Sequence, residues 1–135
     1  MSKILALDYG EKRIGYAVSD VTRTIAFPRE ALAAKPEEKF FAKLKEIVRV
    51  EGISKIIIGV PLDEDNEDTV TSRRAKKFGE AIARHLMLPI EFIDEFNSTK
   101  EALSKIPFRK DRRKKGVADA IAAQIILQRY LDYNT

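Results

Sequence analysis

The amino-acid sequence predicts an α/β fold built on a mixed five-stranded sheet, with three antiparallel strands followed by two parallel ones and helices on both faces. Two continuous apolar runs, at residues 4–7 and 56–58, are typical of strands buried on both faces. A helical stripe lies between these runs, and a strand that follows a crossover helix is most simply parallel to the strand before it. The 135 residues fit a single domain, residues 1–135, that can bury a core without disulfides.

The first strands are predicted to form an antiparallel meander. Residues 4–8 form a buried strand, and residues 12–19, in which apolar and more polar side chains alternate, form the second strand of a hairpin. Residues 24–30 are expected at the edge of the sheet, because Pro28 has no N–H to donate to a neighbouring strand.

The rest of the chain alternates helices and strands. Residues 36–38, a proline and two glutamates, begin a helix that Gly52 ends. Residues 55–61 and 88–95 then form buried strands parallel to the first, and a capping box at residues 98–101 begins a short helix.

Two further helices are predicted from apolar faces of helical spacing. The helix between the two later strands has a face formed by Ala75, Phe78, Ala81, Ile82 and Leu86. The last helix runs from near Gly116 to about Leu131, with an inner face formed by Val117, Ala118, Ile121, Ala122 and Ile125.

Three carboxylates are expected to meet at one edge of this sheet. Asp8 and Glu95 each end a parallel strand, and the carboxyl ends of parallel strands lie at the same edge. Asp119 begins the last helix among alanines, whose small side chains would let that helix approach the sheet closely. An Asp-x-Gly sequence alone more often begins a turn, and Gly10 would let the backbone leave the strand. The convergence of Asp8, Glu95 and Asp119 nevertheless predicts catalytic, metal-binding residues.

Carboxylates drawn together raise one another's pKa unless a cation lies between them. Ligands that offer only oxygen favour Mg²⁺ or Mn²⁺. Two such ions roughly 4 Å apart can activate the attacking water and stabilise the leaving oxygen in phosphodiester cleavage. We therefore expect a hydrolytic site that holds Mg²⁺ or Mn²⁺, two ions in all.

A basic loop precedes the last helix, and it predicts a nucleic-acid partner. Six of the seven residues 109–115 are basic, although cations are unfavourable before a helix N-terminus, so a phosphate backbone is the expected occupant. The residues expected to contact nucleic acid are Lys12, Arg13, Arg109, Lys110, Arg112, Arg113, Lys114 and Lys115. Phe108 could stack on a base or anchor the loop in the core, and the sequence leaves both open.

Other charged segments favour less specific interpretations. The acids of residues 63–68 lack the glycine and the distant glutamate of a calcium loop, so a solvated loop is expected. The basic residues among positions 73–77 most often form a solvated face, although they could also meet phosphates. The absence of cysteine excludes disulfides and thiolate metal sites. With no leader-like or membrane-spanning run, we expect a cytoplasmic protein with no membrane partner.

Short motifs occur in a specific order along nearly the whole chain. They are Ala6-Leu7-Asp8-Tyr9-Gly10, Lys12-Arg13-Ile14-Gly15 with Ser19-Asp20, Ile58-Gly59-Val60-Pro61-Leu62, Asp94-Glu95, and Lys115-Gly116-Val117-Ala118-Asp119-Ala120-Ile121-Ala122-Ala123 with Ile126-Leu127-Gln128. With these motifs the chain resembles the YqgF family of RNase H-like nucleases, also described as RuvX or as Holliday junction resolvases.

The resemblance implies an RNase H-like fold and a magnesium- or manganese-dependent nuclease with catalytic carboxylates at Asp8, Glu95 and Asp119. The family was linked first to Holliday junctions and later to maturation of the 5′ end of 16S ribosomal RNA precursors. The expected partner is therefore pre-rRNA, which we favour, or a four-way DNA junction. A homodimer would suit a junction with two arms, but no feature of the sequence demonstrates one.

Two segments depart from the family pattern, and two other function classes remain open. Residues 63–66 replace a short Asn-Met-Asp-Gly turn, and Phe96 and Asn97 replace an arginine and an apolar residue. Loss of that arginine removes a phosphate contact and so affects substrate affinity or choice.

Sugar-kinase and actin-like ATPases share the strand, Asp-x-Gly and hairpin, but they close two such domains around ATP. A catalytically silent nucleic-acid-binding module is the other alternative.

Overall fold

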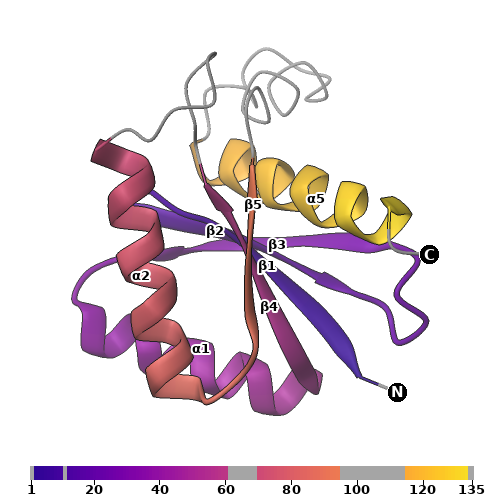
Figure 1. Ribbon diagram of the computed structural model, residues 1–135, viewed down its shortest axis with the longest axis horizontal. Coiled ribbons are helices and arrows are strands. Elements are labelled where there is room, and N and C mark those ends of the chain that lie inside the picture. Colours follow the sequence, from indigo (N-terminus) through magenta and orange to yellow (C-terminus); the bar gives the residue numbers. More distant parts are fainter. Residues whose placement is uncertain (1, 11, 61–69, 95–114, 134–135) are drawn as a thin grey trace.

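The computed structural model describes residues 2–10, 12–60, 70–94 and 115–133, and it contains a five-stranded sheet with helices on both faces (Figure 1). In chain order the elements are β1 (Lys3–Asp8), β2 (Arg13–Ser19), β3 (Ala26–Ala33), α1 (Glu37–Glu51), β4 (Ile53–Val60), α2 (Val70–Leu86), β5 (Ile90–Asp94) and α5 (Lys115–Tyr133). The predicted capping box at residues 98–101 and the predicted loop at 63–68 lie outside the described residues. Among the helices described, none has the length and apolar character needed to cross a membrane.

The strands lie in the order β3-β2-β1-β4-β5. The pairs β1–β2 and β2–β3 are antiparallel, whereas β1–β4 and β4–β5 are parallel. The predicted mixed sheet and its strand directions are therefore confirmed. The strand that contains Pro28, β3, lies at the edge, as expected for a residue that cannot donate a backbone hydrogen bond.

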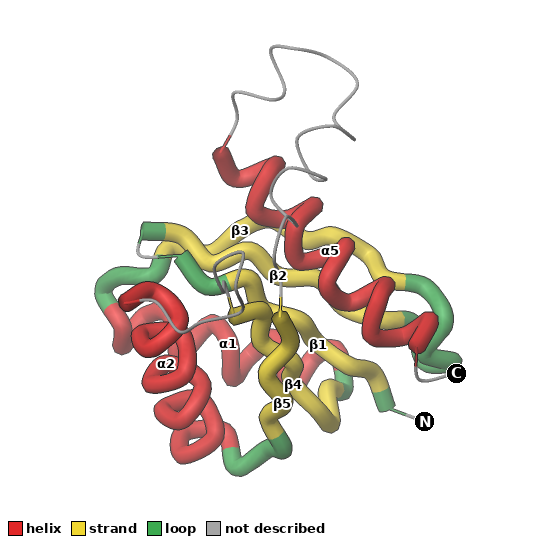
Figure 2. The backbone as a smooth tube through the Cα atoms, turned by 45° about the horizontal axis from the view of Figure 1, so that its top comes forward, coloured by secondary structure: helices red, strands yellow, loops and turns green. Residues whose placement is uncertain are grey.

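The central strand β1 is apolar because both of its faces are covered. Leu5 and Leu7 pack in the core cluster formed with α1 and α2, whereas Ile4 and Ala6 pack in the cluster formed with α5. Figure 2 shows α1 and α2 on one side of the sheet and α5 on the other. Since successive side chains of a strand point to opposite faces, Asp8 follows Ile4 and Ala6 on the α5 face.

The helix α1 begins and ends where the sequence predicts. It follows Pro36, carries Glu37 in its first turn, and ends at Gly52, whose left-handed φ of 70° favours glycine. The N–H of Gly52 donates to the carbonyl of Val48 at 3.1 Å, which closes the last turn.

The predicted inner face of α5 is only partly correct. Ile121 is half-buried, and Ala122 and Ile125 are buried in a small cluster separate from the main core. The α5 residues in the core cluster shared with the sheet are Ala123, Ile126, Leu127, Tyr130 and Leu131. The side chains of Val117 and Ala118 lie outside the described part. Apolar residues surround much of this helix, so its periodicity does not single out one face.

Two glutamines attach α5 to the edge strand β3. The side chain of Gln128 accepts a hydrogen bond from the Ala26 N–H at 2.9 Å and donates one to the Thr24 carbonyl at 2.8 Å. Gln124 donates to the Ala26 carbonyl at 3.1 Å. These bonds satisfy backbone groups of an edge strand and hold the helix across the sheet. The position of Asp119, near the start of the same helix, is thereby also constrained.

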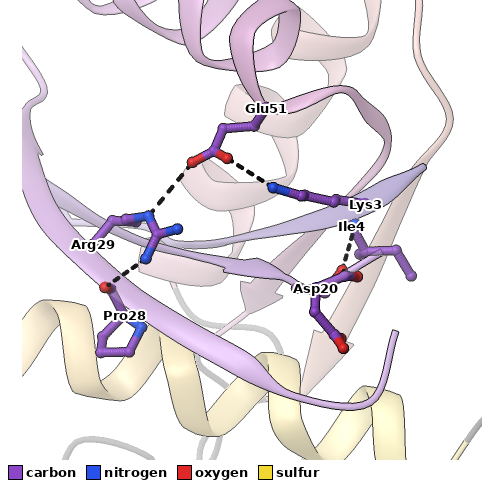
Figure 3. A network of polar contacts seen from close by, with 7 residues as sticks. Lys3, Ile4, Asp20, Pro28, Arg29 and Glu51 are labelled. Carbon is purple, nitrogen blue, oxygen red and sulfur yellow. Dashed lines mark hydrogen bonds and ion pairs between the residues drawn. The ribbon is translucent and has the colours of Figure 1, made fainter. Parts of the chain in front are cut away.

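Glu51, the last residue of α1, links that helix to two strands. Figure 3 shows its carboxylate between Lys3 of β1, whose Nζ lies 3.0 Å away, and Arg29 of β3, whose Nε lies 3.5 Å away. The hydrogen bond from Lys3, supported by the charge of Arg29, holds the pKa of Glu51 below its usual value. A carboxylate with a lowered pKa stabilises the fold above its unfolded-state pKa of about 4.3, and the contribution is lost as the pH falls through the folded-state pKa.

Replacing Glu51 with glutamine is expected to lower the free energy of unfolding at pH 7 by about 0.5–1 kcal/mol, because the ion pairs are lost at a partly exposed site. The difference from the wild type should shrink as the pH falls through the lowered pKa of Glu51, because the glutamate then becomes protonated in both states. Urea unfolding at pH 7, 4 and 2 measures this change. Glu30→Gln, at an exposed glutamate of β3, is the matched control. An equal loss at all three pH values would contradict the assignment.

Candidate functional site

Asp8 lies at the carboxyl end of the central strand, between two glycines. In the β1–β2 pair it is opposite Gly15, and in the β1–β4 pair it is opposite Gly59. Ile57, two residues before Gly59, packs in the α5-side core, so Gly59 is on the same face of the sheet as Asp8. The residues paired with Asp8 on either side therefore carry no side chain.

Gly15 also lets α5 approach the sheet closely. A Cβ atom added at Gly15 would lie 2.1 Å from the backbone oxygen of Asp119 and 3.0 Å from its Cβ. The backbone of Asp119 thus lies directly over Gly15, the residue that pairs with Asp8. The structure brings these two predicted carboxylates to the same end and the same face of the sheet.

Arg13 joins this group from the start of β2. Its Nε donates to Oδ2 of Asp119 at 3.1 Å, and the two side chains are 37% and 29% exposed. Lys12 is exposed next to it in the hairpin between β1 and β2. Of the basic residues predicted to bind nucleic acid, Arg13 therefore lies beside a predicted catalytic carboxylate.

The hairpin that carries these residues depends on Gly10. A Cβ added at Gly10 would lie 2.3 Å from the carbonyl oxygen of Arg13, a contact that no side chain could make without moving the backbone. The predicted role of Gly10, to let the chain leave β1 directly after Asp8, agrees with this close approach.

Several predicted site residues cannot be placed. Glu95, Arg109, Lys110, Arg112, Arg113 and Lys114 lie outside the described residues. Lys115 is the first residue of α5, but its side chain is not described. Within the described part of the chain, no group of three acids or histidines forms a metal site. The third carboxylate and the basic loop thus remain sequence predictions.

The carboxylates that are placed suit a hard divalent cation. Asp8 and Asp119 offer only oxygen donors, and such donor sets bind Mg²⁺ or Mn²⁺ rather than softer metals. Gly59, which pairs with Asp8 on the side away from Gly15, adds no side chain beside this carboxylate. The residues present therefore fit a metal of this class.

Sequence reasoning did not identify the roles of Gly15 and Gly59. The available signal was an isolated glycine within a strand pattern, which often marks a close approach of another backbone. The contact between Arg13 and Asp119 carried no such signal, because it joins residues 106 positions apart.

Comparisons of this sequence with known proteins agree on one family. The sequence model of the RuvX family, described as Holliday junction resolvase, matches residues 2–133. A relative from Maridesulfovibrio salexigens is 37% identical over 131 residues, which cover 96% of this chain and 97% of the relative. A relative from Sulfurihydrogenibium is 40% identical over 134 residues, covering 98% of this chain and 91% of the relative. Both relatives carry the provisional name pre-16S rRNA nuclease.

Solved structures share the fold at low sequence identity. Thermus thermophilus RuvC in complex with a Holliday junction substrate superposes with a TM-score of 0.61 at 14% identity, covering 99% of this chain and 96% of that one. The fowlpox virus resolvase in complex with Holliday junction DNA gives a TM-score of 0.56 at 12% identity, with 98% of each chain covered. These likenesses establish the RNase H-like fold predicted from the sequence.

Proposed function

Because the chain belongs to the RuvX family of Holliday junction resolvases, we propose that it is a metal-dependent endonuclease that hydrolyses phosphodiester bonds in structured nucleic acid. The observation that supports this proposal most directly is the position of Asp8 and Asp119 on one face of the sheet, with Arg13 beside them. Acidic side chains suit a divalent cation, and the neighbouring arginine suits the phosphate that such a cation binds.

In the proposed mechanism Asp8 and Asp119 hold Mg²⁺ or Mn²⁺, with Glu95 as the predicted third ligand. When bound, the metal would lower the pKa of a water molecule and stabilise charge on the leaving oxygen. Gly59, the partner of Asp8 in β4, would place no side chain between Asp8 and the sugar-phosphate backbone. Arg13 holds the carboxylate of Asp119, and its guanidinium would exchange this contact for a phosphate of the bound substrate.

We favour pre-16S rRNA as the substrate, since relatives that match over nearly their whole length carry the name pre-16S rRNA nuclease. The family resemblance places the cleavage at the 5′ end of this precursor. Cleavage of a four-way DNA junction is the second candidate, since the family model is described as a Holliday junction resolvase. The ATPase class is disfavoured, because the nuclease family model spans residues 2–133.

The substrate is tested by incubating the protein with labelled pre-16S rRNA and a labelled four-way DNA junction side by side. Each reaction contains Mg²⁺, Mn²⁺ or EDTA. We expect metal-dependent cleavage of the RNA near its 5′ end and none in EDTA. Cleavage of the junction alone would support the second candidate. Salt-dependent binding without cleavage of either substrate would instead indicate a silent binding module.

Replacing Arg13 with glutamine is expected to weaken nucleic-acid binding by about tenfold and to reduce the slope of log K against log salt by about 0.9, the effect of one lost phosphate contact. The free energy of unfolding should change by less than about 1 kcal/mol, because the ion pair with Asp119 is partly exposed. Titration of labelled RNA at several salt concentrations measures the slope. Arg49→Gln removes another surface ion pair, on α1, and should leave binding unchanged. An unchanged slope in Arg13→Gln would contradict a phosphate contact.

A further inference from the structure

A cavity of about 260 Å³ lies at the carboxyl end of β1, on the face of the sheet opposite to Asp119. Its walls come from Tyr9 and Gly10 after β1, from the segment before α1, and from α1 and α2. Among the described residues, Asp8, Arg13 and Asp119 of the proposed metal site do not line this cavity.

The cavity has aromatic walls. The ring centroid of Tyr9 lies 5.1 Å from that of Phe78 on α2, and Phe78 lies 5.4 Å from Phe40 on α1. Phe40 is buried, whereas Tyr9 and Phe78 are only half-buried. The buried ring of Phe40 therefore holds the rings of Phe78 and Tyr9 in place. Because these two rings are already ordered, a ligand that packs on them loses little further side-chain entropy.

The rim of the cavity is basic. Among the described residues that line it, Lys35, Arg74 and Lys77 are exposed cations, against a single carboxylate, Glu37. Arg74 and Lys77 are three positions apart on α2, so they lie on one side of that helix. An aromatic floor with a positive rim matches a nucleobase attached to phosphates, because the ring stacks on aromatic side chains and the phosphates meet the cations.

The cavity is adjacent to the proposed cleavage site. Tyr9 directly follows Asp8, and consecutive Cα atoms are about 3.8 Å apart. Asp8 belongs to the α5 face, whereas Tyr9 contacts Phe78 of α2 on the other face. A strand that crosses the end of β1 would therefore place a phosphate at Asp8 and the base of a neighbouring nucleotide at Tyr9.

We propose that this cavity binds one unpaired nucleobase of the substrate, next to the phosphodiester that is cleaved. The proposal rests on the nuclease function proposed above and extends it to the choice of substrate. A base held in this cavity cannot remain paired and stacked in a duplex. The site therefore selects nucleic acid with an unpaired nucleotide beside the scissile bond over continuous duplex.

Photo-crosslinking tests the position of the base. The Asp8→Asn chain, which should bind without cleaving, is mixed with a set of precursor RNAs that carry 4-thiouridine at each position in turn. After irradiation, mass spectrometry identifies the crosslinked peptide. We expect one position, next to the bond that the wild type cleaves, to crosslink to the peptide that contains Tyr9 or Phe78. Binding with crosslinks only elsewhere would overturn this proposal and leave the nuclease function standing, whereas absence of any binding to the RNA would overturn this proposal together with pre-rRNA as the substrate.

Variants of the wild-type chain test how much the cavity contributes to substrate binding. Tyr9→Leu and Lys77→Gln should each raise KM for the unpaired substrate by about tenfold, whereas Tyr9→Phe should keep the wild-type value. An RNA that lacks the base at the crosslinked position should be cleaved equally by the wild type and by Tyr9→Leu. The matched controls, Tyr133→Leu at a 90% exposed tyrosine and Lys43→Gln at an exposed lysine of α1, should have no effect. Thermal unfolding verifies that each variant folds, and the abasic RNA tests the pocket in the unaltered protein. Equal cleavage of abasic and intact RNA by the wild type would overturn the proposal.

Discussion

Replacing Asp8 with asparagine is expected to reduce metal-dependent cleavage by at least about a thousandfold, a loss of about 4 kcal/mol in transition-state stabilisation. The substitution keeps the size of the side chain but removes the charge that would hold the cation on the face shared with Asp119. Nucleic-acid binding should persist, because it depends mainly on basic residues that contact phosphates. Single-turnover cleavage and a binding titration, carried out on the same RNA, separate the two effects.

The matched control for this substitution is Asp132→Asn. Asp132 is an exposed carboxylate near the end of α5, roughly 20 Å along the helix from Asp119 at 1.5 Å per residue. This variant should cleave as the wild type does. Asp119→Asn, by contrast, should lose activity as Asp8→Asn does. Full activity in Asp8→Asn with Mg²⁺ and Mn²⁺ would refute the site.

Replacing Gly15 with alanine is expected to lower the free energy of unfolding by about 3 kcal/mol and to reduce cleavage by about a hundredfold in the fraction that remains folded. The new methyl group would lie 2.1 Å from the backbone oxygen of Asp119, so α5 must move away from the sheet. Neither partner can yield easily, because one is a central part of the sheet and the other is helix backbone attached to β3 by two glutamines. Urea unfolding measures the stability, and single-turnover cleavage below the unfolding transition measures the activity.

Gly52→Ala separates steric overlap from the conformational cost of replacing a glycine. Gly52 has a left-handed φ of 70°, but no heavy atom lies within 4 Å of an added Cβ. Its replacement should therefore cost only about 1 kcal/mol and leave cleavage unchanged. If Gly15→Ala were no less stable than Gly52→Ala, α5 would not lie as close to β2 as the structure indicates.

Much of the fold follows from local sequence patterns. Apolar runs and alternation predict the strands, and Gly52 predicts the end of α1, because these signals depend on residues that are neighbours in the chain. The inner face of α5 was harder to predict, since apolar residues on several sides satisfy more than one orientation. Contact with the sheet selected the face that contains Leu127 and Tyr130.

In the candidate site, too, some features follow from the sequence and others only from the tertiary structure. The sequence by itself determined that Asp8 ends a central strand and that a parallel arrangement follows, because both depend on hydrophobic patterns and on the handedness of crossovers. Only the tertiary structure decided that Gly15 receives the backbone of Asp119, that Arg13 pairs with that carboxylate, and that Tyr9 faces an aromatic cavity. The physical reason is that these contacts join segments up to 106 residues apart, and packing across the whole sheet determines their geometry.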